Sequence, residues 1–151
     1  MSVQGIVLDA SAYLASCLPE ESEKRQAHAL LDDHAKGRIQ LHAPHLLAAE
    51  ILDGLCKRVR RPEIHPVRIS PEEAVTAWKL FQELRITLHE VGDRGGRIIE
   101  LAHARGWPAT YDMVYVALAE HLQAPLVTAD PRLAALAAQL PFIVPLAKYG
   151  T

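Results

Sequence analysis

Two short apolar runs, each closely followed by an aspartate, constrain the fold of this sequence more than any other feature. Ile6-Val7-Leu8 precedes Asp9, and the run at residues 125–128 precedes Asp130. Neither run alternates apolar with polar residues, as a half-exposed strand would, and such short continuous runs are typical of strands buried in a parallel sheet. We therefore predict a parallel sheet that contains both runs.

Segments with helical periodicity separate these strands. A capping-box pattern begins one of them, with Ser70 as the N-cap, Pro71 at the first helical position and Glu73 at the third. We predict helices at residues 10–18, 20–37, 45–60, 71–85, 93–105, 110–122 and 131–140, and further strands at 39–43, 87–91 and 142–144. The alternation of strands and helices predicts an α/β fold with helices on both faces of the sheet.

A proline-rich stretch interrupts the chain near its middle. Residues 60–71 contain Pro62, Pro66 and Pro71, a density that breaks regular secondary structure. Each half of a 151-residue chain would be small for an independent core. We interpret the stretch as a loop and expect residues 1–151 to form a single domain. A second predicted stop, Gly106-Trp107-Pro108, ends the helix at 93–105.

Composition excludes several classes of protein. The chain has 16 Lys and Arg against 18 Asp and Glu, a net charge of −2, so binding to RNA or lipid needs a local basic patch. It has no apolar stretch of about 20 residues that could span a membrane, and its first apolar segment contains Asp9, unlike a secretory signal. Two cysteines, Cys17 and Cys56, are too few for a disulfide framework. We expect a cytoplasmic protein that does not bind membranes.

Four acidic residues stand where a ligand site could form. Asp9 and Asp130 follow strands at the edge of the sheet where ligands bind, Glu50 lies mid-helix between apolar residues, and Asp112 lies in the first turn of the helix that Thr110 caps. Each also has an ordinary structural explanation. An aspartate after a strand is a common helix N-cap, a helical glutamate is commonly solvated, and an acid in a first turn stabilises the helix dipole.

Taken together, the four acids predict a metal site. No Cys or His joins them at ligand spacing, so the donor atoms are all oxygen, which suits a hard cation such as Mg²⁺ or Mn²⁺. Four carboxylates in one pocket cannot all stay ionised unless a cation neutralises them.

Further polar residues lie close to these acids in the sequence. Ser11 and Thr128 are two residues from Asp9 and Asp130, and their hydroxyls either bond a ligand or satisfy the local backbone. The helix that carries Glu50 ends in a basic cluster that either stabilises the helix dipole or contacts RNA phosphates. This cluster consists of Lys57, Arg58, Arg60 and Arg61.

Several blocks of the sequence resemble the PIN-domain ribonucleases of the VapC toxin type. Residues 110–120 (TYDMVYVALAE) and 124–133 (APLVTADPRL) are similar to the C-terminal signature of that family, and residues 6–11 (IVLDAS) and 48–52 (AAEIL) look like its first two acidic motifs. Their order and spacing agree over nearly the whole chain. The resemblance implies a PIN-like three-layer α/β/α sandwich with a central, mainly parallel sheet. It also implies that Asp9, Glu50 and Asp112 bind Mg²⁺ or Mn²⁺ and that Asp130 completes the acidic pocket.

The resemblance further implies an activity and a partner. We expect a divalent-metal-dependent endoribonuclease that is the toxin of a toxin–antitoxin pair and acts as a homodimer on cellular RNA. Its VapB-like antitoxin would pack a tail on apolar helices near the active cleft. One departure is Asp53, where many relatives have asparagine, and this acid either adds negative charge beside Glu50 or faces solvent.

Two other functions fit parts of the sequence. An Asp-centred phosphatase or receiver domain also places an aspartate at a strand end, but such a phosphatase usually has Asp-x-Asp where this chain has Asp9-Ala10-Ser11, and neither explains Glu50. A non-catalytic RNA- or protein-binding module of the same fold gains nothing from four clustered carboxylates. The nuclease therefore accounts for the acids best.

Overall fold

A five-stranded parallel sheet forms the centre of the computed structural model, which describes residues 2–19, 21–60, 68–105 and 110–151. The strand order is β3-β2-β1-β4-β5, and every neighbouring pair is parallel. The predicted parallel sheet is confirmed, with β1, the first strand of the chain, at its centre. The strands are β1 (Gln4–Leu8), β2 (Ile39–Pro44), β3 (Thr87–His89), β4 (Leu126–Thr128) and β5 (Ile143–Pro145).

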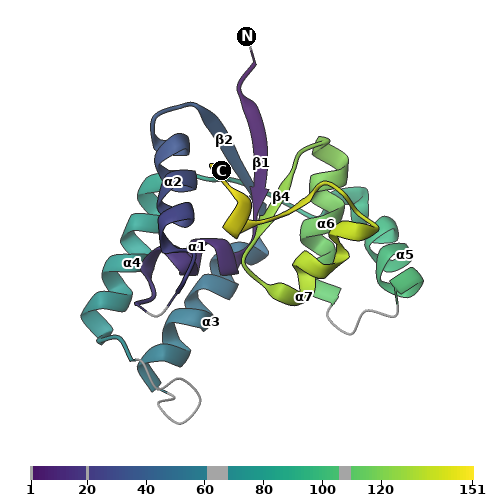
Figure 1. Cartoon of the computed structure of the whole chain (residues 1–151). Coiled ribbons are helices and arrows are strands. Elements are labelled where there is room, and N and C mark those ends of the chain that lie inside the picture. The colour runs from purple at the N-terminus through teal and green to yellow at the C-terminus, as the bar shows by residue number, and fades with distance from the viewer. Residues whose placement is uncertain (1, 20, 61–67, 106–109) are drawn as a thin grey trace.

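Helices cover both faces of this sheet, as the alternation of elements predicted. Figure 1 shows α2, α3 and α4 on one side of the sheet and α5 and α6 on the other. The helices are α1 (Ala10–Cys17), α2 (Lys24–Ala35), α3 (Leu46–Arg60), α4 (Pro71–Leu84), α5 (Gly95–Arg105), α6 (Thr110–Leu122) and α7 (Pro131–Ala134). None of the helices in the described ranges is long and apolar enough to cross a membrane.

The boundaries of several elements differ from the prediction. The helix predicted at 131–140 is α7 followed by a 3-10 turn at Ala135–Ala138, because the chain must soon return to β5 beside β4. The strand predicted at 87–91 ends at His89, since Val91 already has helical dihedral angles. Residues 61–67 of the predicted proline-rich loop and the Gly106-Trp107-Pro108 stop lie outside the described residues.

The central strands β1, β2 and β4 are deeply buried. Val7, Leu8, Leu41 and Leu126 have no exposed surface, which explains why these runs lack polar alternation. The capping box of α4 is present as predicted, with Ser70 Oγ accepting a hydrogen bond from the Glu73 amide and Glu73 Oε1 accepting one from the Ser70 amide, both at 3.0 Å.

A close contact between α1 and α3 brings two of the predicted acids to the same side of the molecule. A Cβ added to Gly54 of α3 would lie 2.5 Å from Leu14 Cδ1 of α1, so a larger residue at this position requires the Leu14 side chain to move. Asp9 precedes α1, and Glu50 lies one turn before Gly54 on α3. The small residue thus leaves room for the Leu14 side chain between the two helices.

Candidate active site

Asp9 is the most buried of the predicted acids. It follows the central strand β1, is 6% exposed and caps α1, so its Oδ1 accepts hydrogen bonds from the Ala12 amide at 3.1 Å and from Ser11 Oγ at 2.6 Å. Its Oδ2 accepts a hydrogen bond from Thr128 Oγ1 of β4 at 2.6 Å. Asp9 is therefore the N-cap of α1, and its second oxygen, Oδ2, is held by Thr128 from the neighbouring strand β4.

The surroundings of Asp9 disfavour its negative charge. Burial is the main cause and raises the pKa of this carboxyl from 3.8 to about 6, although hydrogen bonds from Ser11, Thr128 and the Ala12 amide oppose the rise. The charge of Asp130 raises the pKa further, so these two carboxylates are close enough to repel each other. A nearby positive charge would stabilise both.

Glu50 is held by a residue that the sequence analysis missed. Its Oε1 accepts a hydrogen bond of 2.5 Å from the hydroxyl of Tyr115, which lies on α6 and is 1% exposed. Burial raises the pKa of Glu50, the hydrogen bond from Tyr115 opposes this, and the charges of Asp112 and Asp53 add to the rise. Tyr115 follows Asp112 by three residues on one helix, a spacing that places both on one face and is the signal that could have identified it.

The remaining two acids begin helices. Asp112 lies in the first turn of α6, where the helix dipole favours a negative charge. Asp130 caps α7, with its Oδ1 accepting a hydrogen bond from the Arg132 amide at 2.9 Å. Its own amide donates to Thr128 Oγ1 at 3.0 Å, so Thr128 is hydrogen-bonded to both Asp9 and Asp130.

The four acids thus form two interacting pairs, Asp9 with Asp130 and Glu50 with Asp112. Tyr115 lies among them, because the charges of Glu50, Asp9 and Asp112 all act on its hydroxyl. Within the described ranges, no three His, Cys, Asp or Glu side chains already converge at distances suited to a metal ion. The four acids nevertheless suit a hard divalent cation, because all their donor atoms are oxygens. A cation would also stabilise the negative charges of Asp9 and Glu50, which burial disfavours.

The basic cluster is only partly described by the structure. Lys57 pairs with the exposed Asp53 at 2.7 Å, and the charge of Asp53 also acts on the neighbouring Glu50. Arg58 is 13% exposed, lies 3.8 Å from Glu21, and with Lys57, Ser11 and Ala129 lines a cavity of about 560 Å³. Arg61 and the side chain of Arg60 lie outside the described residues.

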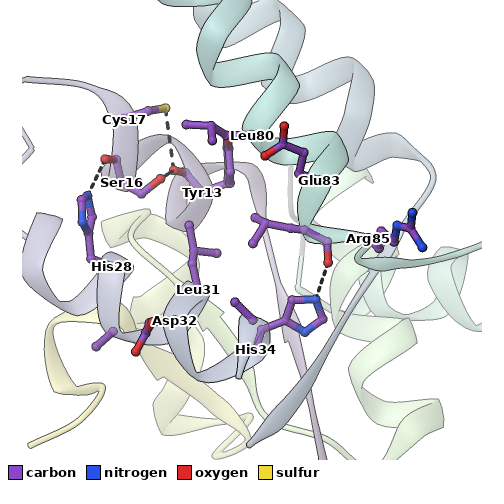
Figure 2. Close-up of a pocket in the computed structure, with 13 residues that line it drawn as sticks. Tyr13, Ser16, Cys17, His28, Leu31, Asp32, His34, Leu80, Glu83 and Arg85 are labelled. Atoms are coloured by element: carbon purple, nitrogen blue, oxygen red, sulfur yellow. Dashed lines mark hydrogen bonds between the residues drawn. The ribbon is translucent and has the colours of Figure 1, made fainter. Parts of the chain in front are cut away.

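A larger hollow of about 910 Å³ lies between α1, α2 and α4. Figure 2 shows its lining, with Leu31 of α2 and Leu80 of α4 on facing walls. His34 Nε2 is 2.7 Å from the carbonyl oxygen of Leu84, which ties α2 to α4 at one end of the hollow. None of the four predicted acids lines this hollow.

Comparisons with known proteins identify a family and several relatives. The PIN domain family matches residues 6–139. The chain is 37% identical over 128 residues to VapC ribonuclease Mb0985 of Mycobacterium bovis and to ribonuclease VapC9 of Mycobacterium tuberculosis, covering 85% of this chain and 87% of each relative. It is 30% identical to ribonuclease VapC3 of Pyrobaculum aerophilum over 85% of this chain and 92% of that protein.

Two solved structures share the fold. PAE2754 from Pyrobaculum aerophilum superposes with a TM-score of 0.62 and 27% identity, covering 88% of this chain and 78% of that one. VapBC2 from Rickettsia felis, solved bound to a DNA fragment from its promoter, gives a TM-score of 0.63 at 14% identity, covering 94% and 97% of the two chains. At that identity the second likeness concerns the fold alone.

Proposed function

Because the chain belongs to the PIN-domain family and to its VapC ribonucleases, we propose that it is an endoribonuclease that depends on a divalent cation, Mg²⁺ or Mn²⁺. The observation that supports this proposal is that acids from separate segments act on one another through their charges, Asp130 on Asp9 and Asp112 on Glu50. The proposed active-site residues are Asp9, Glu50, Asp112 and Asp130.

The residues around the acids support hydrolysis of a phosphodiester bond. A bound divalent cation lowers the pKa of a water molecule and stabilises negative charge on the scissile phosphate and leaving oxygen. Ser11 and Thr128 hold the two oxygens of Asp9 and thereby fix the orientation of that carboxylate. Lys57 and Arg58 line the cavity beside Asp9, and we propose that they, with Arg60 and Arg61, contact RNA phosphates.

The biological role that fits this family is that of a toxin restrained by a protein partner. The chain resembles VapC ribonucleases over 85% of its length, and the VapBC2 structure shares its fold. We propose that it is the toxin of a toxin–antitoxin pair, acts as a cytoplasmic homodimer and binds a VapB-type antitoxin. The residues 1–151 are proposed to act as one domain.

We place the tail of the antitoxin in the hollow between α1, α2 and α4 (Figure 2). Leu80 is 52% exposed on the wall of this hollow, and Leu31 and Leu84 extend the apolar surface. An exposed apolar patch in a concave surface marks a binding site for an apolar segment. An amphipathic helix presents such a segment to a groove.

Replacing Leu80 with glutamate is expected to weaken binding of the antitoxin about 30-fold, because the charge would be desolvated in the groove. RNA cleavage by the free protein should be unchanged. Isothermal titration of the purified partners measures the affinity. Val75→Glu is the matched control, since Val75 is also 52% exposed on α4 but does not line the hollow. Equal loss of affinity in both variants would contradict this placement.

The nuclease proposal is tested by incubating the purified protein with RNA. Cleavage should require Mg²⁺ or Mn²⁺, stop when EDTA is added and disappear in Asp9→Asn. Tight RNA binding that needs no metal and produces no cleavage would instead favour a binding module. A stable covalent phosphate on Asp9 would favour a phosphatase or a receiver domain.

A further inference from the structure

We propose that Tyr115 is a positioning residue that holds the Glu50 carboxylate in the orientation required to bind the divalent cation. This inference rests on the proposed function, because it assigns a role to a neighbour of the proposed ligands. Tyr115 lies inside the segment 110–120 that resembles the family signature, but the resemblance assigned it no role.

The Tyr115 hydroxyl joins two helices of the proposed site. It lies on α6, is 1% exposed and donates to Glu50 Oε1 at 2.5 Å, so it connects α6 to α3 across the site. The hydroxyl is the hydrogen-bond donor of this pair, and the carboxylate oxygen is the acceptor.

Without this hydrogen bond, the Glu50 carboxylate would be placed unfavourably. It is half-buried and is repelled by the charge of Asp112, so it would rotate toward solvent. Fixing Oε1 holds the plane of the carboxylate against this repulsion. The hydroxyls of Ser11 and Thr128 hold the Asp9 carboxylate in the same manner. In both acids, a hydroxyl donor fixes the orientation of the carboxylate.

The test uses Tyr115→Phe, which removes only the hydroxyl, and measures Mn²⁺ binding by isothermal titration calorimetry without RNA. We expect a 10- to 100-fold loss of Mn²⁺ affinity, the usual effect of removing a group that orients a metal ligand. In the cleavage assay, the Mn²⁺ concentration for half-maximal rate should rise by the same factor, and most of the activity should return at saturating Mn²⁺.

Tyr13→Phe is the matched control. Tyr13 is 2% exposed and donates through its hydroxyl to the Ala77 carbonyl at 2.5 Å, a contact between α1 and α4 away from the acids. This variant should melt at a lower temperature and bind Mn²⁺ as tightly as the wild type. A double-mutant cycle adds a second measurement, since Tyr115→Phe should cost little further Mn²⁺ affinity in a Glu50→Gln background.

Wild-type affinity in folded Tyr115→Phe would overturn the inference, as would an equal loss in Tyr13→Phe or full additivity in the cycle. If Tyr115→Phe does not fold, Mn²⁺ affinity is instead compared for Tyr115→Leu in the wild-type background and in the Glu50→Gln background. A wild-type protein that binds Mn²⁺ but leaves RNA intact would refute the nuclease and still test Tyr115. A wild-type protein that binds no Mn²⁺ would overturn the inference itself.

Discussion

Replacing Asp9 with asparagine is expected to abolish RNA cleavage and, at the same time, to stabilise the metal-free protein at neutral pH. The loss of cleavage should be about 10³-fold or more, because the variant removes a charge that the proposed cation requires. The gain in stability follows from burial, which raises the pKa of Asp9 to about 6. Keeping this group ionised above that pH costs roughly 3 kcal/mol, and a neutral amide avoids that cost.

The hydrogen bonds around Asp9 allow this exchange. The hydroxyls of Ser11 and Thr128 can each donate or accept, so they can satisfy an amide as well as a carboxylate. Thermal melts with EDTA at pH 7.5 measure the effect. Asp33→Asn is the control and should lower the melting temperature. The hydroxyl of Tyr149 and the guanidinium of Arg38 lower the pKa of Asp33, so the charge of this residue stabilises the fold. A lower melting temperature for Asp9→Asn would contradict the explanation.

Adding a divalent cation is expected to raise the melting temperature of the wild type at pH 7.5, and the rise should disappear in acid. At a Mn²⁺ concentration 100 times the dissociation constant, binding stabilises a protein by about 2.7 kcal/mol, or about 5 to 10 °C for a chain of this size. Removing the cation with EDTA should reverse the rise and stop RNA cleavage completely.

The pH dependence has a definite sign. Because the folded pKa of Asp9 is raised, its contribution to the stability of the metal-free protein is fully present below pH 3.8 and is lost as the pH rises through about 6. The raised pKa of Glu50 acts in the same direction. The cation replaces these protons, so its effect should grow over the same pH range. Melts with Mn²⁺ and with EDTA between pH 4.5 and 8 measure it, and a difference independent of pH would refute this coupling.

Local features of the sequence were sufficient to predict most elements, because they depend on residues close together in the chain. The apolar runs at β1 and β4 and the capping box at Ser70 all follow from short-range patterns. The predictions failed where tertiary constraints intervene, as at the end of α7, where the helix stops early so that the chain can reach β5.

The sequence by itself determined the order of the elements and the positions of the four acids, since a strand end or a first helical turn is a local property. Only the tertiary structure decided the strand order around β1, the burial that raises the pKa of Asp9 and the hydrogen bond from Tyr115 to Glu50. The physical reason is that burial and contact depend on packing between segments. Tyr115 and Glu50 are 65 residues apart and meet only because α3 and α6 reach the same edge of the sheet.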